Sequence, residues 1–79
     1  MIIEVCGPGC PRCQATEKNV LQALKELGKE AEVVKVKDFK EISARGVMMT
    51  PAVIIDGVKA FEGRIPNAEE IKSWLQEKA

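Results

Sequence analysis

The residues best suited to chemistry in this sequence are two cysteines separated by two residues, Cys10 and Cys13. They fall where a short apolar run ends in Gly7-Pro8-Gly9 and a helical pattern begins at Pro11. The first turn of a helix has unpaired backbone N–H groups and the positive end of the helix dipole, and both stabilise a thiolate. A thiolate is the form of cysteine that attacks disulfides. We therefore expect Cys10 to be the nucleophile and Cys13, one turn further in, to resolve the mixed disulfide.

Two residues between the cysteines are expected to tune this chemistry. Arg12 adds positive charge near the thiolate, which favours its ionised form. Pro11 suits the first position of a helix, because its missing N–H would have no partner there. A third cysteine, Cys6, ends the apolar run, where a lone cysteine is more often a packing residue than a reactive one.

A soft-metal or metalloid site is the alternative reading of the same cysteines. Cys6, Cys10 and Cys13 could supply three thiolates if Cys6 points inward, and thiolates favour zinc, copper(I) and other thiophilic metals. A tetrahedral zinc site needs a fourth ligand, and the chain has no histidine and no second CxxC. The redox interpretation of the cysteines needs no bound metal and no other cofactor, and the three-thiolate site stays its alternative. A module with a degenerate site is disfavoured by the intact cysteine pair.

The hydrophobic pattern predicts an α/β fold in the order β-α-β-α-β-β-α. Short apolar, β-branched runs indicate strands, and apolar residues at helical spacing indicate helices. Asp38 and Asn67 are helix N-cap residues, and Asp56-Gly57 is a strong hairpin signal. The predicted strands are Ile2–Cys6, Ala31–Val36, Ala52–Ile55 and Val58–Phe61, and the predicted helices are Pro11–Leu27, a short one after Asp38 and one after Asn67.

The order of these elements predicts one four-stranded mixed sheet with helices on both faces. A helix joins the first two strands, which makes them parallel, and a hairpin joins the last two. We expect the strand order 2-1-3-4, with the third strand antiparallel to the others. The helix residues expected to face the core are Val20, Leu21, Leu24 and Leu27, then Phe39 and Ile42, and finally Ile71, Trp74 and Leu75.

Composition excludes several classes of function. The 79 residues predict a single domain, 1–79, and the balance of 12 basic and 12 acidic side chains gives no basic face for nucleic acid. No apolar run reaches the roughly 20 residues of a membrane span. The first residues lack the pattern of a signal peptide, so we expect a cytoplasmic protein, where cysteines serve redox chemistry or metals more often than structural disulfides.

The sequence resembles the thioredoxin superfamily, and in particular its small prokaryotic redox-active disulfide proteins. Similarity extends over almost the whole chain. It is carried by Cys10-Pro11-Arg12-Cys13, by Gly46-Val47, by the segment from Thr50-Pro51 to Asp56-Gly57, and by Gly63 with the last helix. The resemblance implies a thioredoxin fold and protein disulfide oxidoreductase activity through a reversible Cys10–Cys13 disulfide, without a prosthetic group. It also implies electron transfer from a reductase or a small thiol to protein disulfides, and we expect the chain to act as a monomer.

The same resemblance implies further site residues. The proline that matches Pro51 is cis in thioredoxins and lies against the disulfide, where it excludes metals. The backbone of the residue before it, here Thr50, pairs with the substrate peptide. Glu4 stands six residues before Cys10, at the offset of the buried acid that assists proton transfer in thioredoxins. The pair between the cysteines is Pro11-Arg12 where thioredoxins have Gly-Pro, which makes a different substrate range the expectation.

Overall fold

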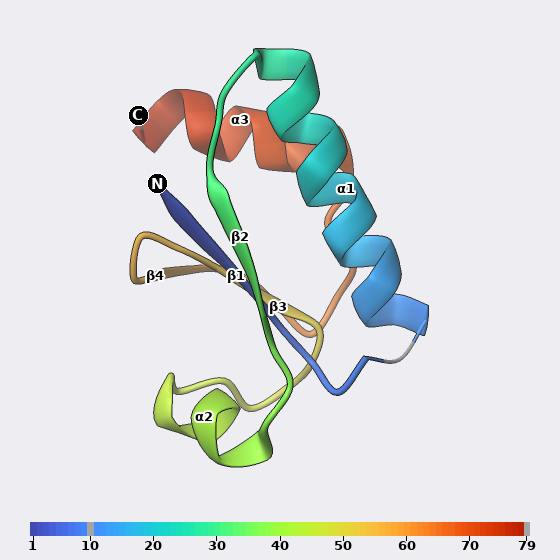
Figure 1. Cartoon of the computed structure of the whole chain (residues 1–79), viewed down its shortest axis with the longest axis vertical. Coiled ribbons are helices and arrows are strands. Elements are labelled where there is room, and N and C mark those ends of the chain that lie inside the picture. The colour runs from blue at the N-terminus through green and yellow to red at the C-terminus, as the bar shows by residue number, and fades with distance from the viewer. Residues whose placement is uncertain (10, 79) are drawn as a thin grey trace.

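The computed structural model describes residues 1–9 and 11–78 and contains the predicted elements in the predicted order. Figure 1 shows the sheet with α1 and α3 packed together on one side and α2 apart from them. Two strands differ from prediction by one residue: β2 starts after Ala31, and β4 extends to Glu62. The elements are β1 (Ile2–Cys6), α1 (Pro11–Leu27), β2 (Glu32–Val36), α2 (Phe39–Ala44), β3 (Ala52–Ile55), β4 (Val58–Glu62) and α3 (Ala68–Lys78).

The strands form one mixed sheet in the order β2-β1-β3-β4, which confirms the predicted topology. β1 pairs with β2 in parallel, while β3 is antiparallel to both β1 and β4. The hairpin turn has positive φ at Asp56 (48°) and Gly57 (83°), as a tight two-residue turn requires. Asp56 Oδ1 also accepts a hydrogen bond of 2.8 Å from the Ile2 N–H, so the turn holds the start of β1 in register.

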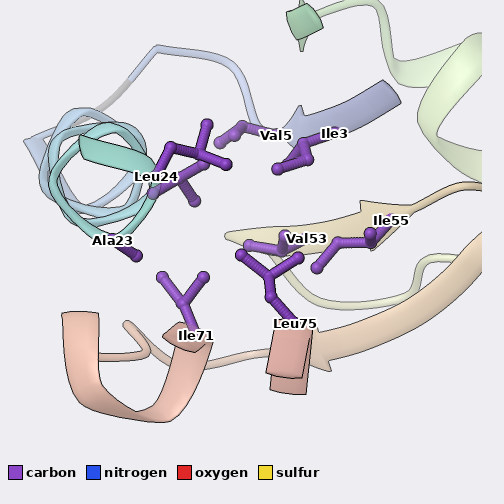
Figure 2. Close-up of a cluster of buried hydrophobic side chains, with 9 residues drawn as sticks. Ile3, Val5, Ala23, Leu24, Val53, Ile55, Ile71 and Leu75 are labelled. Carbon is purple, nitrogen blue, oxygen red and sulfur yellow. The ribbon is translucent and has the colours of Figure 1, made fainter. Parts of the chain in front are cut away.

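The main hydrophobic core lies between the sheet and the helices α1 and α3. Strand residues at alternate positions point to this side, as the period of two predicts. Figure 2 shows the strand side chains facing those of the two helices. The buried set is Ile3, Val5, Val53 and Ile55 from the strands, Val20, Ala23 and Leu24 from α1, and Ile71 and Leu75 from α3. This packing fixes the position of α1 relative to the end of β1, where the CxxC motif lies.

The opposite face of the sheet has a smaller core beneath α2. It contains Cys6, Val36, Ile42, Val47, Ala52 and Ile54. Ile42 is buried as predicted, but Phe39 is wrong as a core residue, because 68% of it is exposed at the start of α2. A helix of six residues presents only one buried side chain to the sheet. Leu21 of α1 is also wrong as a core residue, with 49% exposed. Trp74 is half-buried at the edge of the main core.

No helix in the part of the chain that the structure describes is long and apolar enough to cross a membrane.

Candidate functional site

The turn between β1 and α1 is anchored to the sheet on one side and to the helix on the other. The Gly7 N–H donates a hydrogen bond of 2.9 Å to the Val36 carbonyl, which continues the pairing of β1 with β2 by one residue. Gln14 Nε2 donates to the Gly9 carbonyl at 3.3 Å. α1 begins at Pro11, the predicted first position of the helix. Cys10, the predicted nucleophile, lies outside the described residues, so its role stays a prediction.

Cys13 is buried in the first turn of α1, against the backbone of Gly7. A β-carbon at Gly7 would overlap Cys13 Sγ and lie 3.1 Å from Cys13 Cβ. The same point is 3.8 Å from Thr50 Cβ. Gly7 is therefore the residue that lets the sulfur of Cys13 approach the end of β1. Two predicted site residues, Cys13 and Thr50, meet at this glycine although they lie 37 positions apart in the chain.

The Thr50–Pro51 peptide bond is cis, and Pro51 is buried just before β3. The Pro51 carbonyl accepts a hydrogen bond of 2.9 Å from the Gly63 N–H. Arg12 also reaches Gly63, whose carbonyl accepts a hydrogen bond of 3.4 Å from Arg12 Nη2. The residues predicted to tune the thiolate and to bind substrate are thus linked through one glycine after β4.

A carboxylate that the sequence did not single out holds the segment before Thr50. Glu62 Oε2 accepts hydrogen bonds from the backbone N–H groups of Met48 and Met49, at 2.6 Å and 3.2 Å. Its other oxygen forms an ion pair of 2.9 Å with Lys59 Nζ, which also donates to the Gly46 carbonyl at 3.0 Å. The lysine and the two backbone donors hold the pKa of Glu62 down, to about 2. β4 therefore fixes the backbone that leads into the cis bond.

We expect Glu62 to stabilise the fold above the pKa of an ordinary glutamate. Since the folded pKa is the lower one, this contribution is complete above about pH 4.5 and is lost as the pH falls towards 2. Glu62→Gln removes both the charge and one acceptor, so the variant should be less stable at neutral pH and lose stability less steeply between those values. Denaturant unfolding at several pH values measures this, with Glu30→Gln in the exposed loop before β2 as control. Parallel acid profiles for wild type and Glu62→Gln would contradict the assignment.

The two methionines before Thr50 form part of an exposed apolar rim. Met48 is 91% exposed and Met49 is 63% exposed, so neither side chain belongs to the core. Atoms of the Met49 side chain lie 3.3–3.6 Å from the position that a β-carbon of Gly63 would occupy. Met49 therefore lies over Gly63, the residue that both Arg12 and Pro51 contact.

Glu4 and Cys6 lie on the face of the sheet that α2 covers, away from Cys13. Glu4 Oε2 pairs with Arg45 Nε at 2.8 Å, with both side chains partly buried. Cys6 is fully buried in the smaller core. Burial raises the pKa of the Cys6 thiol, the Glu4 carboxylate adds to the rise, and Arg45 opposes it. The structure thus assigns Glu4 to an ion pair with Arg45, and its proton-transfer role stays a prediction.

The described residues contain no group of three histidine, cysteine or acidic side chains close enough to hold a metal ion, and Cys10 is not among the residues compared. Cys6 points to the α2 side of the sheet, whereas Cys13 belongs to α1, which packs on the other side. The geometry of these two thiols therefore gives no support to a shared thiolate site.

The sheet order, its flanking helices and the cis Thr50–Pro51 bond before β3 define a thioredoxin fold. A family model described as a thioredoxin domain matches residues 1–76. A protein named thioredoxin from Methanocaldococcus jannaschii is 50% identical over 76 residues, covering 96% of this chain and 87% of that protein. One of the same name from Methanothermobacter thermautotrophicus is 41% identical over 75 residues, covering 95% and 97%.

The chain belongs to the thioredoxin family. A probable thioredoxin from Methanothermobacter thermautotrophicus is 36% identical over 68 residues, which is 82% of this chain and 79% of that protein. Membership confirms the resemblance that the sequence indicated and makes the chain a disulfide oxidoreductase.

Proposed function

We propose that this chain exchanges electrons with protein disulfides through a reversible disulfide between Cys10 and Cys13. The observation that carries the proposal is the packing of Cys13 against Gly7 beside Thr50, which is followed directly by the cis bond to Pro51. A buried thiol one helical turn from a reactive one is in the right place to resolve a mixed disulfide.

On the side of the protein, the reaction uses only the sulfur atoms of Cys10 and Cys13. The Cys10 thiolate attacks one sulfur of a substrate disulfide, and the other substrate sulfur leaves as a thiolate that takes up a proton. Cys13 then loses its proton and attacks Cys10, which forms the Cys10–Cys13 disulfide and releases the second substrate thiol. A reductase, or two molecules of a small thiol that become one disulfide, returns two electrons and two protons to the pair. No cofactor takes part, and the proposed setting is a monomer in the cytoplasm.

Thr50 and Pro51 are proposed to receive the substrate, and Arg12 to tune the thiolate. Arg12 is exposed and directed towards the Gly63 carbonyl, so its charge stays next to the cysteine motif. α1 has 17 residues and no acidic side chain in its first turn, so nothing in that turn opposes the positive end of its dipole. Pro11 starts the helix without an unpaired N–H.

A redox titration of metal-free protein, with alkylation and peptide mapping at each potential, tests this function. We expect Cys10 and Cys13 to form one reversible disulfide. Cys6 should stay reduced throughout and react with the alkylating agent only after unfolding, because it is buried and its raised pKa leaves little thiolate. Failure of that disulfide to form, or protection of all three thiols only after metal is added back, would replace this proposal by the soft-metal site.

A further inference from the structure

A small cleft opens beside Cys13 on the side of the molecule that β2 borders. Its volume is about 70 Å³, and its lining includes Cys13, Gln14, Gly7, Gly9, Lys35 and Lys37. β1 and β2 run in parallel, so the end of β2 and the residues after it reach the same edge of the sheet as the turn before α1 (Figure 1). This places two lysines next to the predicted resolving cysteine.

The cleft and the Thr50–Pro51 segment lie on different sides of β1. β1 stands between β2 and β3 in the sheet. Lys35 belongs to β2 and Lys37 follows it, whereas Pro51 precedes β3. A disulfide bound to the sulfurs of the CxxC motif could therefore extend towards either side. The β3 side has the cis bond and the exposed methionines, and the β2 side has the lysines.

The charges around the cleft leave it positive. Lys35 Nζ is 3.5 Å from Glu17 Oε2, so one lysine is largely offset. Lys37 is exposed and makes no ion pair with any residue in the ranges 1–9 and 11–78. Its stem lies along the turn, with Cε 3.9 Å from the position of a Gly9 β-carbon. The helix dipole gives the first turn of α1 a partial positive charge, and no acidic side chain in that turn offsets it.

The volume of the cleft and its position beside Cys13 limit the kind of ligand that it can bind. One water molecule needs about 10–15 Å³ of such a volume, so a cleft of about 70 Å³ accepts a group of a few heavy atoms, such as a carboxylate. Cys13 itself lines the cleft. An acidic group bound there must therefore be joined by only a few bonds to the ligand sulfur that exchanges with the cysteine motif. A thiol with an acidic group close to its sulfur meets both conditions.

We propose that this cleft binds the acidic group of a low-molecular-weight thiol, and that the chain exchanges electrons with such thiols in preference to neutral or cationic ones. The inference rests on the proposed function, since the reaction is the same exchange. One acidic disulfide accepts two electrons and two protons from the reduced Cys10–Cys13 pair and gives two thiols, while the pair becomes a disulfide. The reverse reaction makes the acidic thiol the electron donor.

Three small disulfides of similar length test the preference: the anionic disulfide of mercaptopropionate, the neutral one of mercaptoethanol and the cationic cystamine. Reduced protein should react fastest with the anionic disulfide and slowest with cystamine. Lys37→Gln should lower the anionic-to-neutral rate ratio by roughly two- to fivefold, the usual size of one exposed charge interaction. Lys35→Gln should also lower it, because the change removes a positive charge and leaves the Glu17 carboxylate unpaired near the cleft. Added salt should reduce the wild-type ratio.

The ratio separates binding of the acidic group from a general change in thiolate reactivity, because a shifted cysteine pKa alters all three rates alike. Lys40→Gln in α2 is the matched control and should keep the wild-type ratio. An unchanged ratio in Lys37→Gln overturns the inference. Reduction of insulin without reaction with any small disulfide also overturns it but leaves the proposed function in place. Failure to reduce insulin and all three small disulfides would overturn both.

Discussion

Cys10→Ser is expected to lower disulfide reduction to the rate of the uncatalysed mixture, whereas Cys13→Ser is expected to stop after the first attack. A serine hydroxyl stays protonated at neutral pH and does not attack a disulfide without a strong base, so loss of the nucleophile removes the first step. Loss of Cys13 keeps that step and removes the second. The mixed disulfide should then accumulate to one equivalent of substrate per chain.

Insulin reduction and mass spectrometry of the intact protein distinguish the two variants. Cys10→Ser should show neither turnover nor adduct, and Cys13→Ser should show no turnover with a stable adduct on Cys10. Cys6→Ser is the matched control, because Cys6 is buried among apolar residues on the α2 side of the sheet. Cys6→Ser should keep disulfide reductase activity, provided that the variant folds with the serine hydroxyl in the smaller core. Full reductase activity of Cys10→Ser would exclude Cys10 as the nucleophile.

The fold was largely predictable because its signals are local. Periods of two and of 3.6, together with the punctuation at Gly7–Gly9, Asp38, Asp56-Gly57 and Asn67, identify seven elements that the structure confirms. The connections then restrict the topology, because a helical crossover makes β1 and β2 parallel and a two-residue turn makes β3 and β4 antiparallel. These rules give the pairs β1–β2 and β3–β4, and the predicted order 2-1-3-4 joined them through β1 and β3, as the structure does.

The burial of single side chains was less predictable where an element is short or lies at an edge. Phe39 and Ile42 are three residues apart and share a helical face in principle. Ile42 is buried in the smaller core, but Phe39, at the first position of α2, is largely exposed. Leu21 follows the buried Val20 and falls on the solvent side of the stripe that faces the core. The spacing of apolar residues along a helix does not show which of them lie over the sheet and which lie past its edge.

The site was predictable where a motif identified the residue and unpredictable where the contact depends on tertiary structure. The cysteine motif pointed to Cys13, and the family resemblance to Thr50 and Pro51. The structure places Cys13 and Thr50 at the same glycine, while the roles of all three stay predictions. Glu62 was not identified, because its partners are backbone N–H groups 13 and 14 residues away, and the sequence predicted that β4 ends before it. A bulge in the pairing of β3 with β4, between Val53 and Ile54, lies between the hairpin turn and Glu62.

Gly7 makes room for the side chain of Cys13, a role that its position in a turn did not indicate. A glycine between a strand and Pro8 reads as a turn residue, yet φ is not positive at Gly7 as it is at Gly9. What requires glycine at position 7 is the approach of Cys13 Sγ, which occupies the space of a β-carbon. A methyl group there has no room on the helix side, and Thr50 Cβ lies just beyond it at 3.8 Å.

Gly7→Ala is therefore expected to lower the free energy of unfolding by about 1–3 kcal/mol, the usual cost of overpacking a filled site. It should also slow the second step of exchange, because Cys13 must move to accommodate the methyl group. In the Gly7→Ala variant, the mixed disulfide should persist for longer before Cys13 releases it. Stopped-flow measurement of substrate release, together with denaturant unfolding, gives the two quantities.

A double-mutant cycle assigns the effect to the sulfur. Removing Sγ with Cys13→Ala should make Gly7→Ala less destabilising than it is in the wild type, because the methyl group then lies against a smaller side chain. Gly28→Ala is the contrasting variant: it has positive φ but no atom within 4 Å of its β-carbon position, so its cost should not depend on Cys13. If Gly7→Ala lowers the free energy of unfolding equally in the wild type and in Cys13→Ala, contact with Cys13 Sγ is not the reason that position 7 requires glycine. Cys13 would then have room to move even when a methyl group is present at position 7.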